Sequence, residues 1–185
     1  MQKRYELSDQ TKVVDGVIVH RIRRISNGEL GGWVETERNL NQDDHSWVFD
    51  DSVVLGDARI SLNVKVFESS VVKDNTQLSG TIDVRGGSVV GGNGLRASGN
   101  ICFNGRVVKA QGDFLHLSGL MYPITVFKDG AVDIGCETKS IEEWIVMDET
   151  MFPEVTDQAS AAQMRSILLP LLKYLAANFV ERESA

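Results

Sequence analysis

The chain has 185 residues, of which 42% are hydrophobic and 24% charged, a globular balance that argues against disorder. Its net charge of −7 argues against a nucleic-acid partner, and no apolar run is long enough to span a membrane. Two cysteines are too few for a disulfide scaffold, and the N-terminus has no apolar signal sequence. We therefore expect a cytoplasmic protein.

Residues 1–46 are predicted to form an N-terminal cap. β-branched residues over 13–25 surround a turn at 15–16, which is typical of a β-hairpin. Such a hairpin would cover the open backbone edge of the structure that follows. The glycines at 31–32 indicate a close backbone approach, and we expect the indole of Trp33 to close the end of the next element.

An internal repeat follows the cap. From Val48 to Val90 every sixth residue is aliphatic: Val48, Val54, Ile60, Val66, Val72, Leu78, Val84 and Val90. A small residue usually follows four positions later, and Asn, Asp or Gly is frequent between. A period of six fits neither a helix nor an alternating strand, but it fits a triangular coil with three six-residue sides. Valine pairs recur every 18 residues, one coil, at 53–54, 71–72, 89–90 and 107–108.

These hexads resemble the hexapeptide-repeat family, whose fold is the left-handed parallel β-helix. The predicted fold is therefore mainly β: a left-handed parallel β-helix of 18-residue triangular coils, with an N-terminal β cap and a C-terminal α-helix. The segments at 28–35 and 134–144 resemble those of uncharacterised phage- and prophage-borne members.

We expect the solenoid to cover residues 47–138, regular over 47–95 and less regular over 96–138. Arg96 interrupts the aliphatic column, and Cys102 is expected to resume it pointing inward. The later stretch could instead be a different small module.

Residues 139–185 form the predicted helical segment. Ser140 and Glu143 fit a capping box for a short helix, and a longer helix is expected over 158–181. The longer helix contains Pro170 and is apolar on most sides, so we expect it to pack on the solenoid and on another subunit.

The repeat register sorts the outward residues onto three sides. The first is predicted to be apolar and to include Ile101 and Phe103. It carries the expected ligand or partner surface: Trp47, Phe49, Lys65, Phe67 and Arg85. The third is polar and expected to face solvent, with Arg59, Ser61, Gln77, Ser79, Leu95 and Ala97.

The second side presents a stripe of valines, and together with the C-terminal helix it forms the predicted oligomer interface. This interface comprises Val53, Val71, Val89, Val107, Leu168, Leu172, Leu175 and Phe179. Hexapeptide proteins are commonly trimers, so the resemblance implies a homotrimer. The alternative is a monomer whose termini cover both apolar sides.

The sequence does not identify a catalytic residue. His45, beside Asp43 and Asp44, is the weak candidate for a general base. Cys102 and Cys136 are interpreted as packed core thiols, and no Cys/His cluster with metal-ligand spacing occurs. We therefore predict no metal and no cofactor.

The leading hypothesis is a non-catalytic, homo-oligomeric β-helix protein that binds a protein or small ligand through a rigid face or an inter-subunit cleft. The resemblance implies a phage-encoded antagonist of a host system, with its partner in the cytoplasm of a bacterial host cell. One alternative is a hexapeptide-repeat acyltransferase that uses coenzyme A and an interface histidine. Another is a structural assembly protein.

Overall fold

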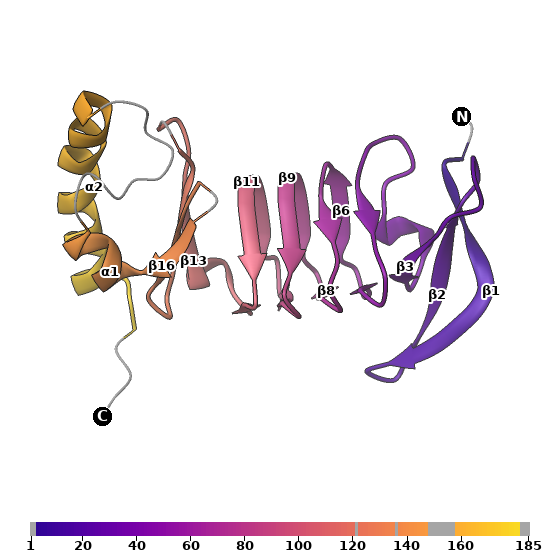
Figure 1. Cartoon of the computed structure of the whole chain (residues 1–185). Helices are drawn as coiled ribbons and strands as arrows, with labels where there is room; N and C mark the ends of the chain where they lie inside the picture. The colour runs from indigo at the N-terminus through magenta and orange to yellow at the C-terminus, as the bar shows by residue number, and fades with distance from the viewer. Residues whose placement is uncertain (1–2, 121, 136, 148–157, 182–185) are drawn as a thin grey trace. The chain divides into compact units, whose positions relative to one another are not determined.

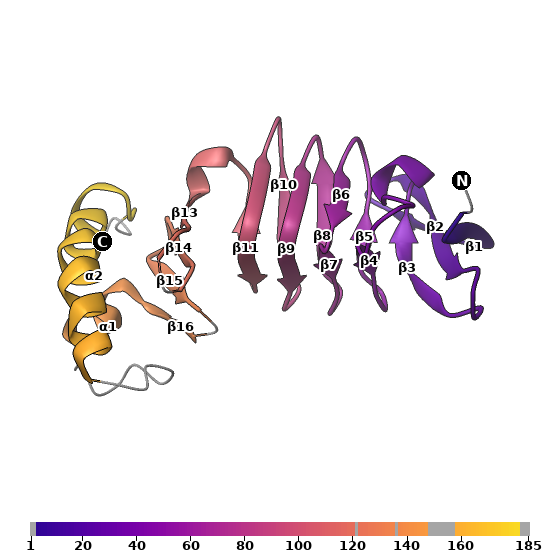
Figure 2. The ribbon, with the colours of Figure 1, turned by 90° about the horizontal axis from the view of Figure 1, so that it is seen from above.

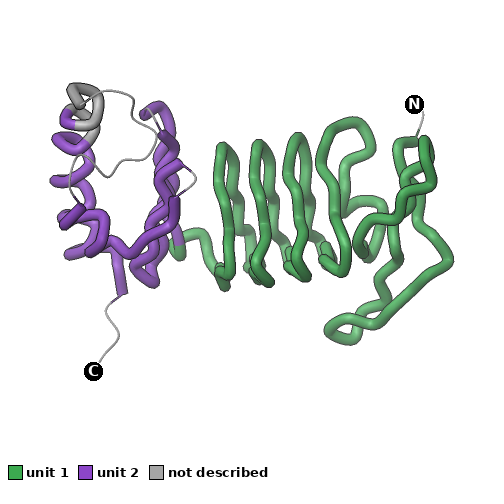
Figure 3. Tube along the Cα trace, in the orientation of Figure 1, with its two compact units in different colours: residues 1–113 green, residues 114–185 purple. Residues whose placement is uncertain are grey.

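The computed structural model describes residues 3–120, 122–135, 137–147 and 158–181. The chain divides into two compact units, residues 1–113 and 114–185 (Figure 3). Unit 1 holds the N-terminal cap and the coils, and unit 2 holds a separate antiparallel sheet and two helices.

The cap is the β-hairpin that the sequence predicts. Strands β1 (Tyr5–Val14) and β2 (Val17–Arg24) are antiparallel, and β3 (Leu30–Val34) pairs with the other edge of β2. β3 then pairs in parallel with a strand of the first coil, so cap and coils share one seven-stranded sheet (Figure 2). The close approach at Gly32 is confirmed, because a Cβ there would lie 2.6 Å from Val48 Cγ1.

Trp33 lies on the outside of the coil, so the expectation that its indole closes the coil end is wrong. Its neighbour Val34 is the residue that points into the coil and is fully buried. Trp33 packs against the outward Val53, and its Nε1 donates a hydrogen bond to Asp51 Oδ1 at 2.9 Å. A hydrogen bond from Lys12 lowers the pKa of Asp51, so this corner carboxylate stays charged and ties the hairpin to the first coil.

The coils stack as a parallel β-helix whose strands lie side by side in register (Figure 1). In chain order the elements are η1 (Glu37–Asn39), β4 (Trp47–Val48), β5 (Val53–Val54), β6 (Arg59–Leu62), β7 (Lys65–Val66), β8 (Val71–Asp74), β9 (Gln77–Arg85), β10 (Val89–Gly92), β11 (Arg96–Asn104), β12 (Val107–Val108) and η2 (Gln111–Asp113). The first three coils pair at the predicted 18-residue offset, as Val53 does with Val71 and Val71 with Val89. All eight aliphatic positions of the repeat are at most 1% exposed, so this column is the core of the coils.

The small inward residues form a ladder of buried serines. The backbone N–H of Ser70 donates to Ser52 Oγ at 3.2 Å, and that of Ser88 donates to Ser70 Oγ at 3.1 Å. The N–H of Arg106 continues the ladder to Ser88 Oγ at 2.9 Å. Each hydroxyl therefore satisfies a backbone donor of the next coil inside the core, where water cannot reach it.

One extra residue shifts the register in the fourth coil. β11 pairs with β9 at an offset of 19, so Phe103 lies beside Val84 and is fully buried, whereas Cys102 is half-buried. The expectation that Cys102 points inward is therefore wrong. The expectation that Leu95 and Ala97 face solvent is wrong too, because both are buried and Ala97 lies beside Leu78. The glycine-rich corner accommodates the insertion: Gly92 has a φ of 153°, and a Cβ there would lie 2.0 Å from a backbone oxygen. The valine pair at 107–108 returns to the 18-residue offset.

Unit 2 is the different module that the sequence left open, so the predicted solenoid extent of 47–138 is too long. Its strands form an antiparallel meander in chain order: β13 (Phe114–Leu117), β14 (Ile124–Phe127), β15 (Ala131–Ile134) and β16 (Glu137–Ser140). The helices are α1 (Ile141–Val146) and α2 (Gln158–Asn178), and α2 runs through Pro170.

The start of α1 confirms the predicted capping box. Glu143 N donates to Ser140 Oγ at 3.1 Å, and Ser140 N donates to Glu143 Oε2 at 2.8 Å. The hydrogen bond that its carboxylate accepts from the Ser140 backbone lowers the pKa of Glu143. The apolar core of the unit lies between sheet and helices and comprises Ile124, Val126, Val132, Ile134, Ile141, Trp144, Met147, Leu168, Leu172 and Leu175.

Candidate functional site

The predicted partner surface is partly covered by the chain itself. Trp47 is 2% exposed, because the guanidinium carbons of Arg4 and Arg24 lie 5.5 and 4.2 Å from its ring centroid. Phe49 and Phe67 are half-buried and meet edge to face, with centroids 6.2 Å apart. The prediction that Trp47 is available to a partner is therefore wrong.

The rest of this side is more polar than predicted. The register shift turns Ile101 and Phe103 inward, where each is at most 3% exposed. Lys65 is exposed and Arg85 is half-buried. Two expected apolar side chains are thus removed from the surface, and this side does not form a continuous apolar face.

The valine stripe of the predicted oligomer interface becomes more exposed along the solenoid. Val53 is 3% exposed because Trp33 of the cap packs against it, so it is unavailable to another subunit. Val71 and Val89 are half-buried, and Val107 is 61% exposed. Only the later part of the stripe is accessible.

The helical part of that predicted interface belongs to the interior of unit 2. Leu168, Leu172 and Leu175 are at most 5% exposed in its core, and Phe179 is half-buried against the same core. Assigning the three leucines to a contact between subunits is therefore wrong, because their own sheet already covers them.

The histidine candidate lacks the neighbour that would make it a base. His45 is exposed, and both oxygens of Asp44 accept hydrogen bonds from elsewhere, one from Ser46 N and the other from Leu62 N. That carboxylate holds a corner of the first coil and does not orient the imidazole. Within the described part of the chain, no three His, Cys, Asp or Glu side chains could hold a metal ion together. Cys136 lies outside the described residues.

A polar groove lies between the loop at 35–42 and the polar side of the coils. It consists of two hollows of about 280 and about 470 Å³, and Arg38 and Arg59 line both. The smaller hollow is also lined by Glu35, Thr36, Asn39, Gly56, Asp57 and Ala58. The larger is also lined by Glu37, Leu40, Asn41, Gln42, Ile60, Ser61, Gln77, Leu78 and Ser79.

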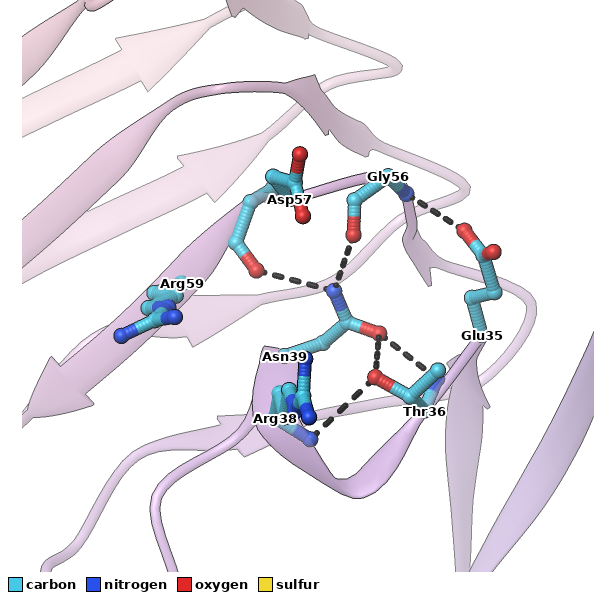
Figure 4. A pocket seen from close by; sticks show the side chains of 8 residues that line it. Glu35, Thr36, Arg38, Asn39, Gly56, Asp57 and Arg59 are labelled. Atoms are coloured by element: carbon cyan, nitrogen blue, oxygen red, sulfur yellow. Dashed lines mark hydrogen bonds between the residues drawn. The ribbon is translucent and has the colours of Figure 1, made fainter.

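Asn39 fastens the wall that carries Arg38 to the first coil (Figure 4). Its side chain is 1% exposed, and Nδ2 donates to Gly56 O and Ala58 O, both at 2.9 Å. Its Oδ1 accepts from Thr36 N at 2.7 Å, and Thr36 Oγ1 caps the turn by accepting from Arg38 N at 3.3 Å. The buried amide of Asn39 thus forms hydrogen bonds with both the turn and the first coil, which fixes the backbone next to Arg38.

Tyr5 and Gln42 fasten the other end of the same loop to β1. Tyr5 Oη donates to Leu40 O at 2.7 Å and to Glu37 O at 3.0 Å. Gln42 Oε1 accepts from Tyr5 N at 3.2 Å, and its Nε2 donates to Tyr5 O at 3.1 Å. Burial raises the pKa of Tyr5 far above its usual value, so the phenol stays a donor. The groove wall is therefore held at both ends.

The two arginines of the groove form no ion pair with a described residue. Arg38 and Arg59 are exposed, and no described residue forms a hydrogen bond or ion pair with either guanidinium. Of the carboxylates that line the hollows, Glu35 accepts a backbone N–H at 2.7 Å and Glu37 forms an ion pair with Lys3 at 2.7 Å. Asp57 lines the smaller hollow and bonds to neither arginine. Two forked donors are thus left facing one groove.

The larger hollow opens onto uncharged polar side chains of the flat coil strands. Strand register places two rows across β6, β9 and β11: Arg59, Gln77 and Arg96, and then Ser61, Ser79 and Ser98. Neither hollow is lined by an aromatic, histidine or cysteine side chain. The arrangement can hold a polar anion, and it offers no nucleophile–base pair.

The sequence predicted the part of this groove that lies on the coils. It placed Arg59, Ser61, Gln77 and Ser79 on one polar side, but assigned that side to solvent. It missed Arg38 because the loop at 35–42 has no repeat from which side-chain direction could be derived. The one local signal was the spacing of Thr36 and Asn39, whose side chains can cap a turn.

Searches against protein-family models and against curated protein sequences found no match to this chain. None of the helices in the described residues is long and apolar enough to cross a membrane. The geometry and charge of the groove are therefore the grounds for a functional proposal.

Proposed function

We propose that this chain is a non-catalytic binding protein whose β-helix holds a rigid polar groove for a small ligand. The observation that carries the proposal is the pair of exposed arginines, Arg38 and Arg59, which line the larger hollow of about 470 Å³. The loop that forms the wall of this hollow is held at both ends by hydrogen bonds. That volume is within the range of about 300–1,000 Å³ common for ligand sites. A preorganised wall lowers the entropic cost of binding.

Binding is favoured over turnover by the chemistry of the lining. Acyl transfer by a hexapeptide-type enzyme needs a general base held at the substrate. His45 is exposed, its neighbouring carboxylate is engaged by backbone donors, and it does not line the groove. The lining instead offers charge and hydrogen bonds, which are the means of recognition.

The experiment is capture of small molecules from a bacterial cell extract by equilibrium dialysis, followed by mass spectrometry. Ser79→Trp places a large ring in the groove, and Ser98→Trp, one coil further in the same row, is the matched control outside it. We expect compounds that wild type and Ser98→Trp retain unchanged and Ser79→Trp does not. Equal retention by all three proteins, or chemical conversion of a retained compound, would contradict the proposal.

Self-association through the accessible part of the valine stripe is the second part of the proposal. Val107 is 61% exposed on a flat parallel strand, and Val89 lies beside it in register. Light scattering is expected to give about three times the 20.4 kDa of one chain, as the resemblance implies. Val89→Lys with Val107→Lys should reduce the particle to one chain. A wild-type monomer would exclude this part.

A further inference from the structure

We propose that the ligand of the groove is an acidic sugar, a polyhydroxylated molecule with one carboxylate or phosphate group. The inference rests on the proposed binding function and adds the chemical class of the ligand. It comes from three properties of the lining: its charge, its hydrogen-bonding groups and its lack of aromatic rings.

The charge of the groove selects an anion. Arg38 and Arg59 both line the larger hollow, where the one carboxylate, Glu37, is paired with Lys3 at 2.7 Å. Asp57 lines only the smaller hollow, so a ligand anion in the larger one does not meet it. The larger hollow thus has two arginines and one paired carboxylate, in a chain with a net charge of −7. The forked guanidinium donors match the paired oxygens of a carboxylate or phosphate.

The remaining lining selects hydroxyl groups. Beyond the arginines, the larger hollow offers the hydroxyls of Ser61 and Ser79 and the amides of Gln77 and Asn41. Gln42 also lines it, but its amide is bonded to the backbone of Tyr5. Hydroxyls and amides both donate and accept, so they complement the hydroxyl groups of a sugar, which do the same. Ser61 and Ser79 lie side by side on neighbouring strands, whose backbones are about 4.8 Å apart.

The absence of aromatic rings from the lining argues against a nucleotide. Recognition of a base commonly uses stacking on an aromatic side chain, worth about 1–3 kcal/mol per base. Neither hollow has a Phe, Tyr, Trp or His in its lining. A free inorganic anion would in turn leave the serine and amide groups of the larger hollow unused. An acidic sugar uses both sets of groups.

Isothermal titration calorimetry with defined probes tests the inference. Glucuronate and glucose 6-phosphate distinguish a carboxylate from a phosphate, glucose removes the charge, inorganic phosphate removes the sugar, and ATP adds a base. We expect at least one of the two acidic sugars to bind about tenfold or more tightly than glucose, inorganic phosphate and ATP. Rising salt should weaken that binding.

Charge-matched variants locate the binding. Arg59→Gln and Arg38→Gln should each weaken the acidic sugar about tenfold or more. Lys65→Gln removes the same charge from another side of the coils and should change affinity less than about twofold. All three side chains are exposed, so unchanged thermal unfolding is expected and confirms that the variants are folded.

Several outcomes would overturn the inference. Glucose, inorganic phosphate or ATP binding as tightly as the acidic sugars would do so, as would equal losses for Lys65→Gln and Arg59→Gln. If neither acidic sugar binds while Ser79→Trp still abolishes retention of other compounds from the extract, the inference fails and the proposed function stands. If nothing is retained in the groove, both fail.

Discussion

The regular coils over 47–95 and the sheet of unit 2 share a period of six but fold differently. In the coils, each sixth residue is buried in a single column and pairs with the residue 18 positions away. In unit 2, Val126 and Val132 are also six apart and buried, but they face each other across an antiparallel hairpin. Leu120, in the same phase, is 40% exposed. A period of six is therefore compatible with both folds.

The column of small residues distinguishes the two regions. In the coils, the fourth residue after an aliphatic is often Ser, Ala or Thr, and the serines bond to backbone N–H groups 18 positions further on. In unit 2, the fourth residue after Leu120 is Ile124, which enters the sheet–helix core and has no hydroxyl to bond to a neighbouring strand. A period of six together with a ladder of buried serines identifies the coils, and the period alone does not.

The largest expected effect tests the aliphatic column. Leu78→Ala should lower the free energy of unfolding by about 2–5 kcal/mol, because Leu78 is 1% exposed in the coil core. Leu120→Ala, the control in the same phase of the repeat, should change it by less than about 0.5 kcal/mol. Urea unfolding followed by tryptophan fluorescence measures both. Similar losses at the two positions would mean that the column does not define the coil core.

A smaller effect tests the serine ladder. Ser70→Ala should cost about 1 kcal/mol, because the N–H of Ser88 loses its side-chain acceptor in a buried position and keeps only a 3.2 Å backbone contact. Ser98→Ala, on an exposed strand position, is the control and should stay within about 0.5 kcal/mol. The same urea titration applies. An unchanged midpoint for Ser70→Ala would show that the ladder does not stabilise the coils.

The weakest effect concerns pH and should be confined to unit 2. Burial lowers the pKa of the half-buried His116, whose Nδ1 lies 3.0 Å from Thr125 Oγ1. The unfolded chain then binds more protons than the folded one as the pH falls below about 6.5, so unit 2 loses stability as the pH falls through that value. Hydrogen exchange of peptides from 114–127, corrected for intrinsic rates, should show this loss.

His116→Gln should remove that pH dependence, and His45→Gln, at an exposed position, should leave it unchanged. Peptides from the regular coils should show no such change over the same range. Equal acid sensitivity of the coils and unit 2 would contradict the assignment to His116.

The sequence determined the regular coils because their repeat is local and redundant. Eight aliphatic positions, their small partners and the corner residues all indicate one coil geometry, and the structure buries all eight. The cap hairpin and the capping box of Ser140 were also predictable, because a turn dipeptide and a four-residue spacing specify them. The register shift at 91–94 was not, since an extra residue among glycines leaves no pattern.

Tertiary structure alone decided what covers each surface and which side chains share a site. Trp47 and the three leucines of α2 were predicted to contact partners, but Arg4, Arg24 and the sheet of unit 2 bury them within the chain. Arg38 lies before the repeat begins, so no repeat pattern relates it to Arg59. The two residues line one groove because Asn39, next to Arg38, binds the first coil. The repeat predicts to which side of its strand a side chain points. The residues that cover that side chain come from segments distant in sequence, and only the tertiary structure brings them together.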